Sequence, residues 1–508
     1  MKDHRVDLTG VFSMQQSQDE KLKGIGNGLS YNSLWYNLAG GSASNTSSSG
    51  FTKTNLMSYL ARANYVYKDK YFVTASIRFD GSSKLAEGNK WGSFPSAAVA
   101  WRVSGEEFMK SLSWLSNLKL RLSYGQTGND NVSAYQTQGS ISGAKYYTFG
   151  SSESIGYVPN NLRNLDLGWE RTTEYNVGLD FGFFNNRISG SVEYYNRLTE
   201  DLIMNKTVPV TTGYSSVKAN VGSVRNEGFE VNINSDNIRT KDFSWRTSLN
   251  FAYNKNKIVD LQYKENLTSR GLSLAGMSGD YSNLWIIGQP IDINYNLMTL
   301  GVWQLDEAEE AAKYFKDSKK TQPFKPGDIK LRDLNGDYII DDKDETYLGS
   351  QSPKWTGGFN NNFSYKNFDL NVYIIARWGQ MIDYELTGSY DPQGKGNFPA
   401  YLNYWTPENP SNDFPRPAQT NFYNYLGYQT LNYIDGSYWK IKTVSLGYTF
   451  PKSLTSKLGV SKLRAYVTAN NLFSFAKNHL IQDYDAERGG SAKAPLQRQF
   501  IFGLNLDF

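Results

Sequence analysis

The sequence has no cysteine and very little histidine, and these absences remove several classes of chemistry. Among its 508 residues there are only two histidines, His4 and His479. Without cysteine the chain forms no disulfide, has no thiol nucleophile and offers no thiolate ligand for zinc. Two histidines also leave little for a histidine-based active site. We therefore expect a protein that is not an enzyme.

Long hydrophobic runs are also missing. The mean hydropathy is −0.55, and even the longest apolar stretches, such as the one from Val372 to Ala376, end after about five residues. A transmembrane helix needs about 20 consecutive apolar residues, so the sequence predicts no membrane-spanning helix. Met1 is followed by charged residues rather than by the apolar core of a signal peptide. For an exported protein, we expect either that the signal was removed or that the chain is a fragment.

The chain has no large excess of charge of one sign. It contains 53 Lys and Arg and 49 Asp and Glu, which gives a net charge of +4. This balance indicates no nucleic-acid partner and no strongly acidic substrate. Aromatic residues are abundant instead, at 15% with 36 tyrosines, together with 45 glycines. Such chains are soluble all-β arrays or outer-membrane barrels, whose polar interior and loops keep the mean hydropathy low.

An alternation of apolar and polar residues is the dominant pattern. It is clear from Leu118 to Tyr124, from Trp245 to Phe251 and from Phe500 to Phe508. A period of two predicts β-strands with one apolar face. The pattern predicts fourteen strands, near residues 5–14, 57–67, 70–80, 93–104, 117–126, 171–184, 187–199, 226–236, 242–254, 354–366, 367–379, 436–450, 461–472 and 498–508. The first of them alternates weakly, because Val6, Leu8 and Val11 break the period.

The connections between these strands alternate between short and mostly long. Short ones include Lys68-Asp69 and Asn185-Asn186, and the longest are 255–353 and 380–435. Outer-membrane barrels have short periplasmic turns and longer extracellular loops. The sequence therefore predicts an all-β fold, an antiparallel up-and-down transmembrane β-barrel segment, with 255–353 and 380–435 as large extracellular loop regions.

This fold assigns a direction to each side chain of the alternating strands. We expect the apolar members to face lipid: Leu118, Leu120, Leu122, Val177, Leu179, Val231, Leu249, Leu504 and Leu506. We expect their charged neighbours to face the lumen: Lys119, Arg121, Asp180, Glu230, Arg246 and Asp507. Charge on the lipid side is unfavourable, which is the reason for this assignment.

Several stretches resemble one family, the SusC/RagA-like TonB-dependent outer-membrane transporters. They include YLARANYVYKDKYFVTASIRFDGSSK from Tyr59, LRLSYGQTGN from Leu120, YNVGLDFGFFNNRISGSVEYYNR from Tyr175, PKWTGGFNNNFSYKNFDLNVY from Pro353 and LRAYVTANNLF from Leu463. With further matches they cover most of residues 57–508 in the family's order. The resemblance implies a parent barrel of about 22 strands with a plugged lumen, of which residues 1–508 are the C-terminal part.

The resemblance also implies partners and a location. Such transporters import oligosaccharides or peptides through the outer membrane of a Gram-negative bacterium, and a SusD-like surface lipoprotein acts as the lid. The plug, the motif that engages TonB and about eight early strands have no counterpart in the chain. The TonB complex would therefore act only through that missing N-terminal part. An alternative hypothesis is a surface adhesin or carbohydrate-binding β protein that transports nothing.

The segment from Asp333 to Asp344 resembles a calcium loop. Its ligands would be Asp333, Asn335, Asp337, the Ile339 carbonyl, Asp341 and Asp344. Oxygen ligands at alternate positions suit a large, flexibly coordinated cation. Position 6 of the loop is Tyr338 where the sharp turn favours glycine, and the last ligand is Asp344 rather than the longer Glu. A solvated turn rich in Asp and Asn is the alternative. A structural calcium is thus possible, and no other cofactor is expected.

One group of aromatic residues is a candidate contact site, and the aromatic residue at the end of the chain is a candidate assembly signal. The residues between 380 and 439 are rich in Tyr and Trp, and the candidates for ligand or lid contact are Tyr401, Tyr404, Trp405, Tyr438 and Trp439. Flat amphipathic rings suit sugar rings or a protein partner, and packing between loops is the third possibility. Phe508 ends the chain on the apolar face of the last strand and resembles the signal that the barrel-assembly machinery recognises.

Overall fold

The computed structural model describes residues 3–29, 37–38, 46–261, 279–280, 285–385, 402–417, 428–456, 459–482, 484–491, 494 and 496–508. Among these residues no helix is long and apolar enough to cross a membrane. The chain forms two compact units. Unit 1 comprises Met1–Trp101, Arg121–Asn176 and Arg197–Ser223, and unit 2 comprises Arg102–Leu120, Val177–Asn196 and Val224–Phe508.

Fourteen long strands form the main sheet, and their order in the sheet follows the chain. They are β1 (His4–Ile25), β2 (Thr46–Tyr67), β3 (Tyr71–Ser82), β4 (Trp91–Arg102), β5 (Leu115–Asn129), β8 (Glu170–Phe183), β9 (Ile188–Glu200), β12 (Ser223–Arg239), β13 (Phe243–Asp260), β20 (Trp355–Tyr365), β21 (Phe368–Trp378), β24 (Tyr438–Thr449), β25 (Lys462–Ala476) and β26 (Gln499–Asp507). Each corresponds to one strand predicted from the sequence. The up-and-down order is confirmed, and no Greek-key crossover occurs in this sheet.

The long connections contain short elements of their own. The additional strands are β6 (Ile141–Phe149), β7 (Ser152–Pro159), β10 (Ile203–Thr207), β11 (Ser216–Asn220), β14 (Gly279–Asp280), β15 (Trp285–Ile286), β16 (Ile293–Leu297), β17 (Thr299–Val302), β18 (Ile329–Leu331), β19 (Glu345–Ser350), β22 (Met381–Asp383) and β23 (Tyr433–Asp435). The two α-helices of the described residues are α1 (Ala308–Ala311) and α2 (Lys452–Thr455). Strands such as β6 and β7, or β16 and β19, pair into two-stranded sheets.

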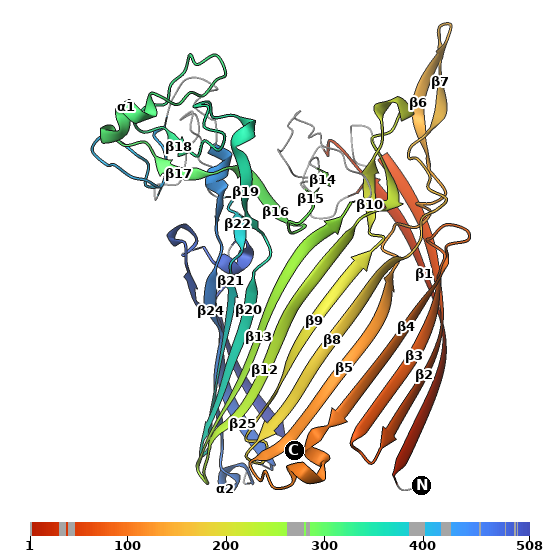
Figure 1. The fold of residues 1–508 in the computed structure, drawn as a ribbon, viewed down its shortest axis with the longest axis vertical. Helices are drawn as coiled ribbons and strands as arrows, with labels where there is room; N and C mark the ends of the chain where they lie inside the picture. Colours follow the sequence, from red (N-terminus) through yellow and green to blue (C-terminus); the bar gives the residue numbers. More distant parts are fainter. Residues whose placement is uncertain are drawn as a thin grey trace. The chain divides into compact units, whose positions relative to one another are not determined.

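The short turns use backbone conformations that few residues adopt. Lys68 and Asp69 have φ of 52° and 51°, and Asn185 and Asn186 have φ of 57° and 59°. Asn and Asp tolerate this left-handed region better than most residues. Within unit 1, Figure 1 shows the β2–β3 turn at one end and the β6–β7 hairpin at the other. Within unit 2, the β20–β21 turn lies at one end and the β16–β19 pair lies at the other (Figure 1).

The strand registers place apolar residues on one face of the sheet, the apolar face, and polar residues on the other, the polar face. In β25 and β26, Leu463, Ala465 and Val467 lie opposite Leu506, Leu504 and Phe502, whereas Arg464 lies opposite Asn505. Most of the leucines and valines expected to face lipid are exposed, namely Leu120, Leu122, Val177, Leu249, Leu504 and Leu506; Leu118, Leu179 and Val231 are half-buried. Arg246, expected on the other side, pairs with Asp236 at 2.7 Å.

The first strand has the mixed apolar pattern that the sequence indicated. Val6, Leu8, Phe12 and Met14 lie opposite Tyr65, Ala63, Tyr59 and Met57, so they share one face and β1 keeps a period of two. Val11 lies opposite Leu60 on the other face, so an apolar side chain breaks the alternation there. Gly10 occupies the apolar-face position between Leu8 and Phe12, and a glycine there hides the pattern.

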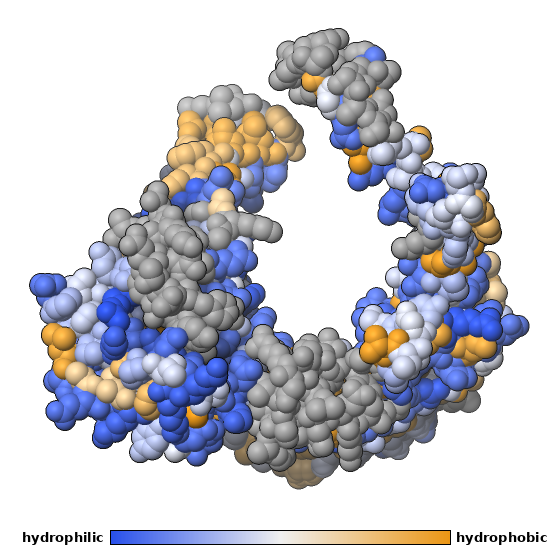
Figure 2. Space-filling view, turned by 90° about the horizontal axis from the view of Figure 1, so that it is seen from above, coloured by the Kyte–Doolittle hydropathy of each residue, from blue (hydrophilic) through white to orange (hydrophobic). Residues whose placement is uncertain are grey.

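The loops of unit 2 have a hydrophobic core of their own. Leu297, Trp303, Ala311, Phe324, Ile329, Leu331 and Ile340 are buried together. Residues 402–416 pack against this region, because Trp405 Nε1 donates a hydrogen bond to Gln304 Oε1 at 2.9 Å. We call residues 293–350 and 402–416 the loop subdomain. The predicted loop regions 255–353 and 380–435 therefore contain a folded part. Seen from above, hydrophilic residues cover most of the described surface (Figure 2).

Candidate functional site

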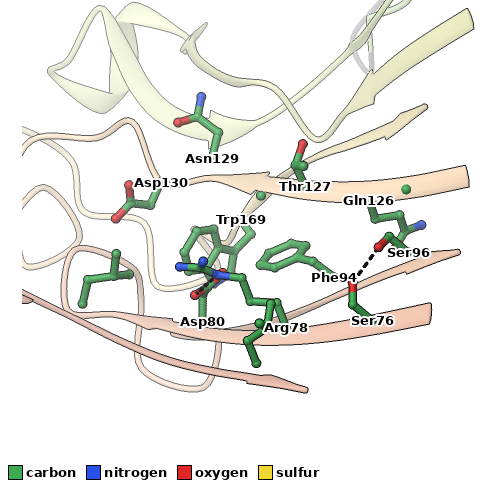
Figure 3. A pocket seen from close by; sticks show the side chains of 14 residues that line it. Ser76, Arg78, Asp80, Phe94, Ser96, Gln126, Thr127, Asn129, Asp130 and Trp169 are labelled. Atoms are coloured by element: carbon green, nitrogen blue, oxygen red, sulfur yellow. Dashed lines mark hydrogen bonds and ion pairs between the residues drawn. The ribbon is translucent and has the colours of Figure 1, made fainter. Parts of the chain in front are cut away.

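A cavity of about 490 Å³ lies in unit 1. Its walls come from β2, β3, β4 and β5, from Asp130, which follows β5, and from Trp169, which precedes β8; Figure 3 shows the side chains that line it. The lining residues are Leu56, Leu60, Ser76, Arg78, Asp80, Phe94, Ser96, Gly125, Gln126, Thr127, Gly128, Asn129, Asp130 and Trp169. Asp80 and Asn129 are near the ends of β3 and β5 that continue into long loops. The cavity is therefore at the loop end of these strands.

An arginine and an aspartate form a fixed pair in the wall. Arg78 Nε donates hydrogen bonds to Oδ1 and Oδ2 of Asp80 at 2.7 and 2.8 Å. Arg78 Nη2 also donates to Ser58 Oγ at 3.0 Å, and Ser58 lies opposite Asp80 on β2. The Asp80 side chain is 10% exposed, whereas that of Arg78 is 46% exposed. The pair thus holds the guanidinium in place and leaves much of it accessible.

A second carboxylate is held in a similar way. Asp130 Oδ2 accepts a hydrogen bond from Ser82 Oγ at 2.6 Å, and Lys84 Nζ lies 3.1 Å from Oδ1. Ser76 and Ser96 share a hydrogen bond of 2.7 Å across β3 and β4 (Figure 3). The charged groups of the cavity wall are consequently paired within the protein.

The floor of the cavity is apolar. The rings of Phe94 and Trp169 meet edge to face with their centroids 5.4 Å apart, and Trp169 Nε1 donates to the Lys90 carbonyl at 2.9 Å. A Cβ on Gly128 would lie 2.1 Å from the Phe94 ring, and one on Gly92 would lie 2.5 Å from it. Only glycine lets the ring lie so close to both strands.

The cavity is suited to binding rather than to catalysis. Its lining presents an arginine, carboxylates, hydroxyls and amides, beside the rings of Phe94 and Trp169, which are only 5% and 8% exposed. None of its lining residues was predicted from the sequence to belong to a site. The available signal was the alternation of Ser76, Arg78, Asp80 and Ser82, which places all four on one face of β3.

The proposed calcium loop forms a compact turn in the loop subdomain. Asp333 accepts backbone hydrogen bonds from Gly336 and Tyr338 at 2.7 and 2.9 Å. Asp344 accepts from Leu334 and Asp341 at 2.8 and 3.0 Å. Tyr338 has φ of 63°, the left-handed conformation for which glycine is favoured at this position.

The side chains of this loop do not form a ready metal site. Within the described residues, no group of three or more His, Cys, Asp or Glu side chains is arranged to hold a metal ion. Asn335 Oδ1 and Asp337 Oδ1 each accept a nearby backbone N–H. Burial raises the pKa of Asp344, and the neighbouring Asp333 and Asp341 carboxylates raise it further. The arrangement agrees with an Asx-rich turn and leaves calcium binding as a proposal.

The candidate aromatic residues have different surroundings. Tyr438 is fully buried at 0% exposure and Trp405 is 4% exposed, so both are packing residues with almost no surface for a ligand. Tyr404 and Trp439 are exposed. The Trp439 ring stacks on that of Phe475 with the ring centroids 4.0 Å apart, and it lies on the strand face opposite to Tyr438. Tyr401 lies outside the described residues. Packing between loops therefore explains the buried members of this group.

Phe508 follows the last residue of β26 and is 91% exposed. Phe500, Phe502, Leu504 and Leu506 occupy alternate positions of the same strand and are exposed as well. The terminal ring thus continues the apolar row of the last strand. This position is compatible with recognition by the assembly machinery, which stays a prediction.

A meander of long antiparallel strands with one apolar face, short turns and large loops defines an outer-membrane β-barrel protein. The model of the family described as "TonB dependent receptor-like, beta-barrel" matches residues 3–472. The chain belongs to this family, whose barrels lie in the outer membrane of Gram-negative bacteria and which consists of receptors and transporters rather than enzymes.

Named relatives and a solved structure are similar over almost the whole chain. TonB-dependent receptor P3 of Formosa agariphila is 34% identical over 99% of the chain and 51% of the relative. TonB-dependent receptor SusC of Bacteroides thetaiotaomicron is 31% identical over 90% of the chain and 44% of the relative. The RagAB peptide transporter structure matches with a TM-score of 0.80 at 24% identity, over 100% of the chain and 54% of the matched chain. The chain spans about half the length of the curated relatives it matches.

Proposed function

We propose that the chain forms the barrel wall and outer loops of a TonB-dependent importer of oligosaccharides or peptides. The observation that carries this proposal is the fourteen-strand meander with a polar face on one side and a folded loop subdomain at its loop end. A polar lumen conducts hydrophilic solutes through a membrane, and large external loops select them. Membership of the family and the likeness to SusC support the same function.

A deletion experiment tests this function in the native bacterium. Deleting the gene that encodes this chain should abolish uptake of a fluorescently labelled oligosaccharide or oligopeptide, while uptake of labelled glucose and alanine stays normal. A strain without TonB should show the same loss, because the energy for import comes through that protein. Unchanged uptake of oligomers together with reduced adhesion to a glycan-coated surface would favour the adhesin hypothesis instead.

The proposed partner is a SusD-like surface lipoprotein that covers the loop end. The loop subdomain supports this, because a folded unit with a buried core offers a defined surface to a partner. An affinity-tagged chain extracted from its own outer membrane in mild detergent should carry one lipoprotein in a constant ratio. Recovery of the chain without a lipoprotein would contradict the partnership and leave the transport proposal intact.

A structural calcium ion in the loop 333–344 is also a proposal, and its pH dependence is a test. Calcium needs ionised carboxylates, and the pKa of Asp344 is raised by burial. Calcium affinity should therefore decrease as the pH falls, beginning at a higher pH than for an ordinary aspartate. Isothermal titration of the EGTA-treated protein measures this. Asp344→Asn should abolish binding, and Asp306→Asn, which lies outside the loop, should not.

The last residue is expected to govern assembly. Phe508→Ser should lower the amount of folded barrel in the outer membrane severalfold, because the assembly machinery would lose the terminal ring. Heat-modifiable migration in electrophoresis separates folded from unfolded protein. Asp507→Ser changes the preceding residue and should leave the folded fraction unchanged. Equal folded fractions for both variants would contradict the assignment.

A further inference from the structure

Two short turns of the main sheet begin with a lysine in the left-handed conformation. Lys68, between β2 and β3, has φ of 52°, and Lys366, between β20 and β21, has φ of 53°. Each backbone N–H donates a 2.7 Å hydrogen bond to the carbonyl of the aspartate that precedes the neighbouring strand, Asp3 for Lys68 and Asp242 for Lys366. The same arrangement therefore occurs once in each unit.

A third turn shows that this backbone conformation does not require lysine. Phe184, the first residue between β8 and β9, has φ of 53°, and its N–H donates to the Trp114 carbonyl at 2.7 Å. Glycine, Asn and Asp are the residues that favour a left-handed conformation, yet the three turns use Lys, Lys and Phe here. The side chain rather than the backbone therefore explains the choice of residue.

Each lysine lies over the tyrosine that precedes it. Lys68 Nζ is 5.2 Å from the centroid of the Tyr67 ring, and Lys366 Nζ is 5.4 Å from that of Tyr365. Both tyrosines are an even number of positions from apolar-face residues of their own strands, so they are on the apolar face too. Both ammonium groups are consequently on the lipid side of the sheet, at the level where the strands end.

The chemistry at this level is that of phospholipid headgroups. Short turns of outer-membrane barrels lie on the periplasmic side, and aromatic rings beside them lie at the headgroups. A lysine in such a place packs its carbon chain on apolar surface and directs its ammonium group to the polar layer. Lys68 and Lys366 are exposed, and Asp69, the acid beside Lys68, is 3.6 Å from Arg5. Their charge is complementary to a lipid phosphate.

We propose that Lys68 and Lys366 bind the phosphate groups of anionic phospholipids in the periplasmic leaflet. The backbone hydrogen bond and the tyrosine ring fix each lysine, so the contact sets the depth of its turn in the membrane. This role depends on the location in the outer membrane and not on the proposed import function. Phe184 occupies the corresponding position of its turn as an apolar anchor that needs no phosphate.

Photochemical cross-linking tests the contact at each turn separately. The full chain, extracted from its own outer membrane in mild detergent, is reconstituted in phosphatidylcholine vesicles that contain a photoreactive phosphatidylglycerol, and cross-linked peptides are mapped by mass spectrometry. We expect cross-links at both lysine turns. Lys68→Asn and Lys366→Asn should each lower the yield at their own turn about fivefold, the factor that one cation contributes at an anionic membrane surface. Asn tolerates the left-handed conformation, so the turn is retained.

Three controls separate the charge from the fold. Lys68→Arg and Lys366→Arg keep the positive charge and should keep most of the yield. Lys313→Asn removes an exposed lysine of the loop subdomain, 59% exposed, and should leave both turns unchanged. High salt should lower the yield at the two lysine turns but not at the Phe184 turn, because only the former depends on charge.

Each outcome decides the proposal. A yield that falls in the Asn variants and is retained in the Arg variants supports it. Equal yields in the Asn variants and the unchanged chain overturn the role of the lysines. Equal yields with a photoreactive phosphatidylcholine overturn the choice of an anionic lipid. No lipid cross-link at either turn overturns the proposal and favours an acidic periplasmic protein as the occupant of this surface.

Discussion

Replacing Asp328 with alanine is expected to destabilise the loop subdomain by about 3–5 kcal/mol, the usual cost of leaving a buried charge without its partner. Asp328 pairs with Lys316 at 2.6 Å, and their side chains are 5% and 7% exposed. Arg416 Nη2 lies 3.2 Å from the same carboxylate. Removing Asp328 leaves Lys316 charged in an apolar setting beside Phe324. Hydrogen exchange of residues 324–331 should become much faster.

The matched control is an exposed ion pair in the same subdomain. Lys313 and Glu310 also lie 2.6 Å apart, but their side chains are 59% and 49% exposed. Glu310→Ala should change stability by less than about 1 kcal/mol, because exposed pairs are screened by solvent. Equal exchange rates in the two variants would show that the buried Asp328 pair stabilises the subdomain no more than the exposed pair does.

The effect of Asp328→Ala should also depend on pH. Burial lowers the pKa of Lys316, and Asp328 opposes that shift. Without Asp328 the folded-state pKa of Lys316 falls further below its unfolded value, so the unfolded state binds more protons. The destabilisation should therefore be greatest at neutral and lower pH and decrease as the pH rises. Hydrogen exchange at two pH values, corrected for the intrinsic rate, measures this.

The second large effect concerns the two faces of the sheet. Leu249 lies opposite Phe359 on the apolar face, and its neighbour Ser248 lies opposite Asn360 on the polar face. Leu249→Arg should destabilise the barrel by about 2–4 kcal/mol, because the arginine would face the hydrocarbon core. Ser248→Arg adds the same side chain one position away and should be tolerated.

The measurement is the denaturant midpoint of the chain folded in lipid vesicles. A lower midpoint for Leu249→Arg than for Ser248→Arg confirms the faces. The reverse order would mean that the polar face contacts lipid, and the register argument would then be wrong for this strand.

The strands and their faces could be predicted from the sequence because strand patterning is local. Residues two positions apart point to the same side, so the row Phe500, Phe502, Leu504 and Leu506 reveals β26 directly. The short turns carry Asn, Asp and Lys between two such rows. In β1 the pattern is weak, because Gly10 has no side chain to mark the apolar face and Val11 lies on the polar face.

The candidate aromatic residues were harder to interpret because a sequence does not show burial. Tyr438 and Trp439 are adjacent and similar in type, yet one is fully buried and the other is exposed. Which face is covered depends on loops that return from elsewhere in the chain. The contact candidates between 380 and 439 could therefore be named from composition but not separated into packing and surface residues.

The sequence by itself determined the all-β meander, its alternating faces and the family resemblance, because each depends on local periodicity or local motifs. Only the tertiary structure decided where the cavity of unit 1 lies and how the loop subdomain folds. Trp405 contacts Gln304 across 101 positions of the chain, and Arg416 contacts Asp328 across 88. Such contacts leave no period in the sequence, since the partners are chosen by packing in three dimensions rather than by spacing along the chain.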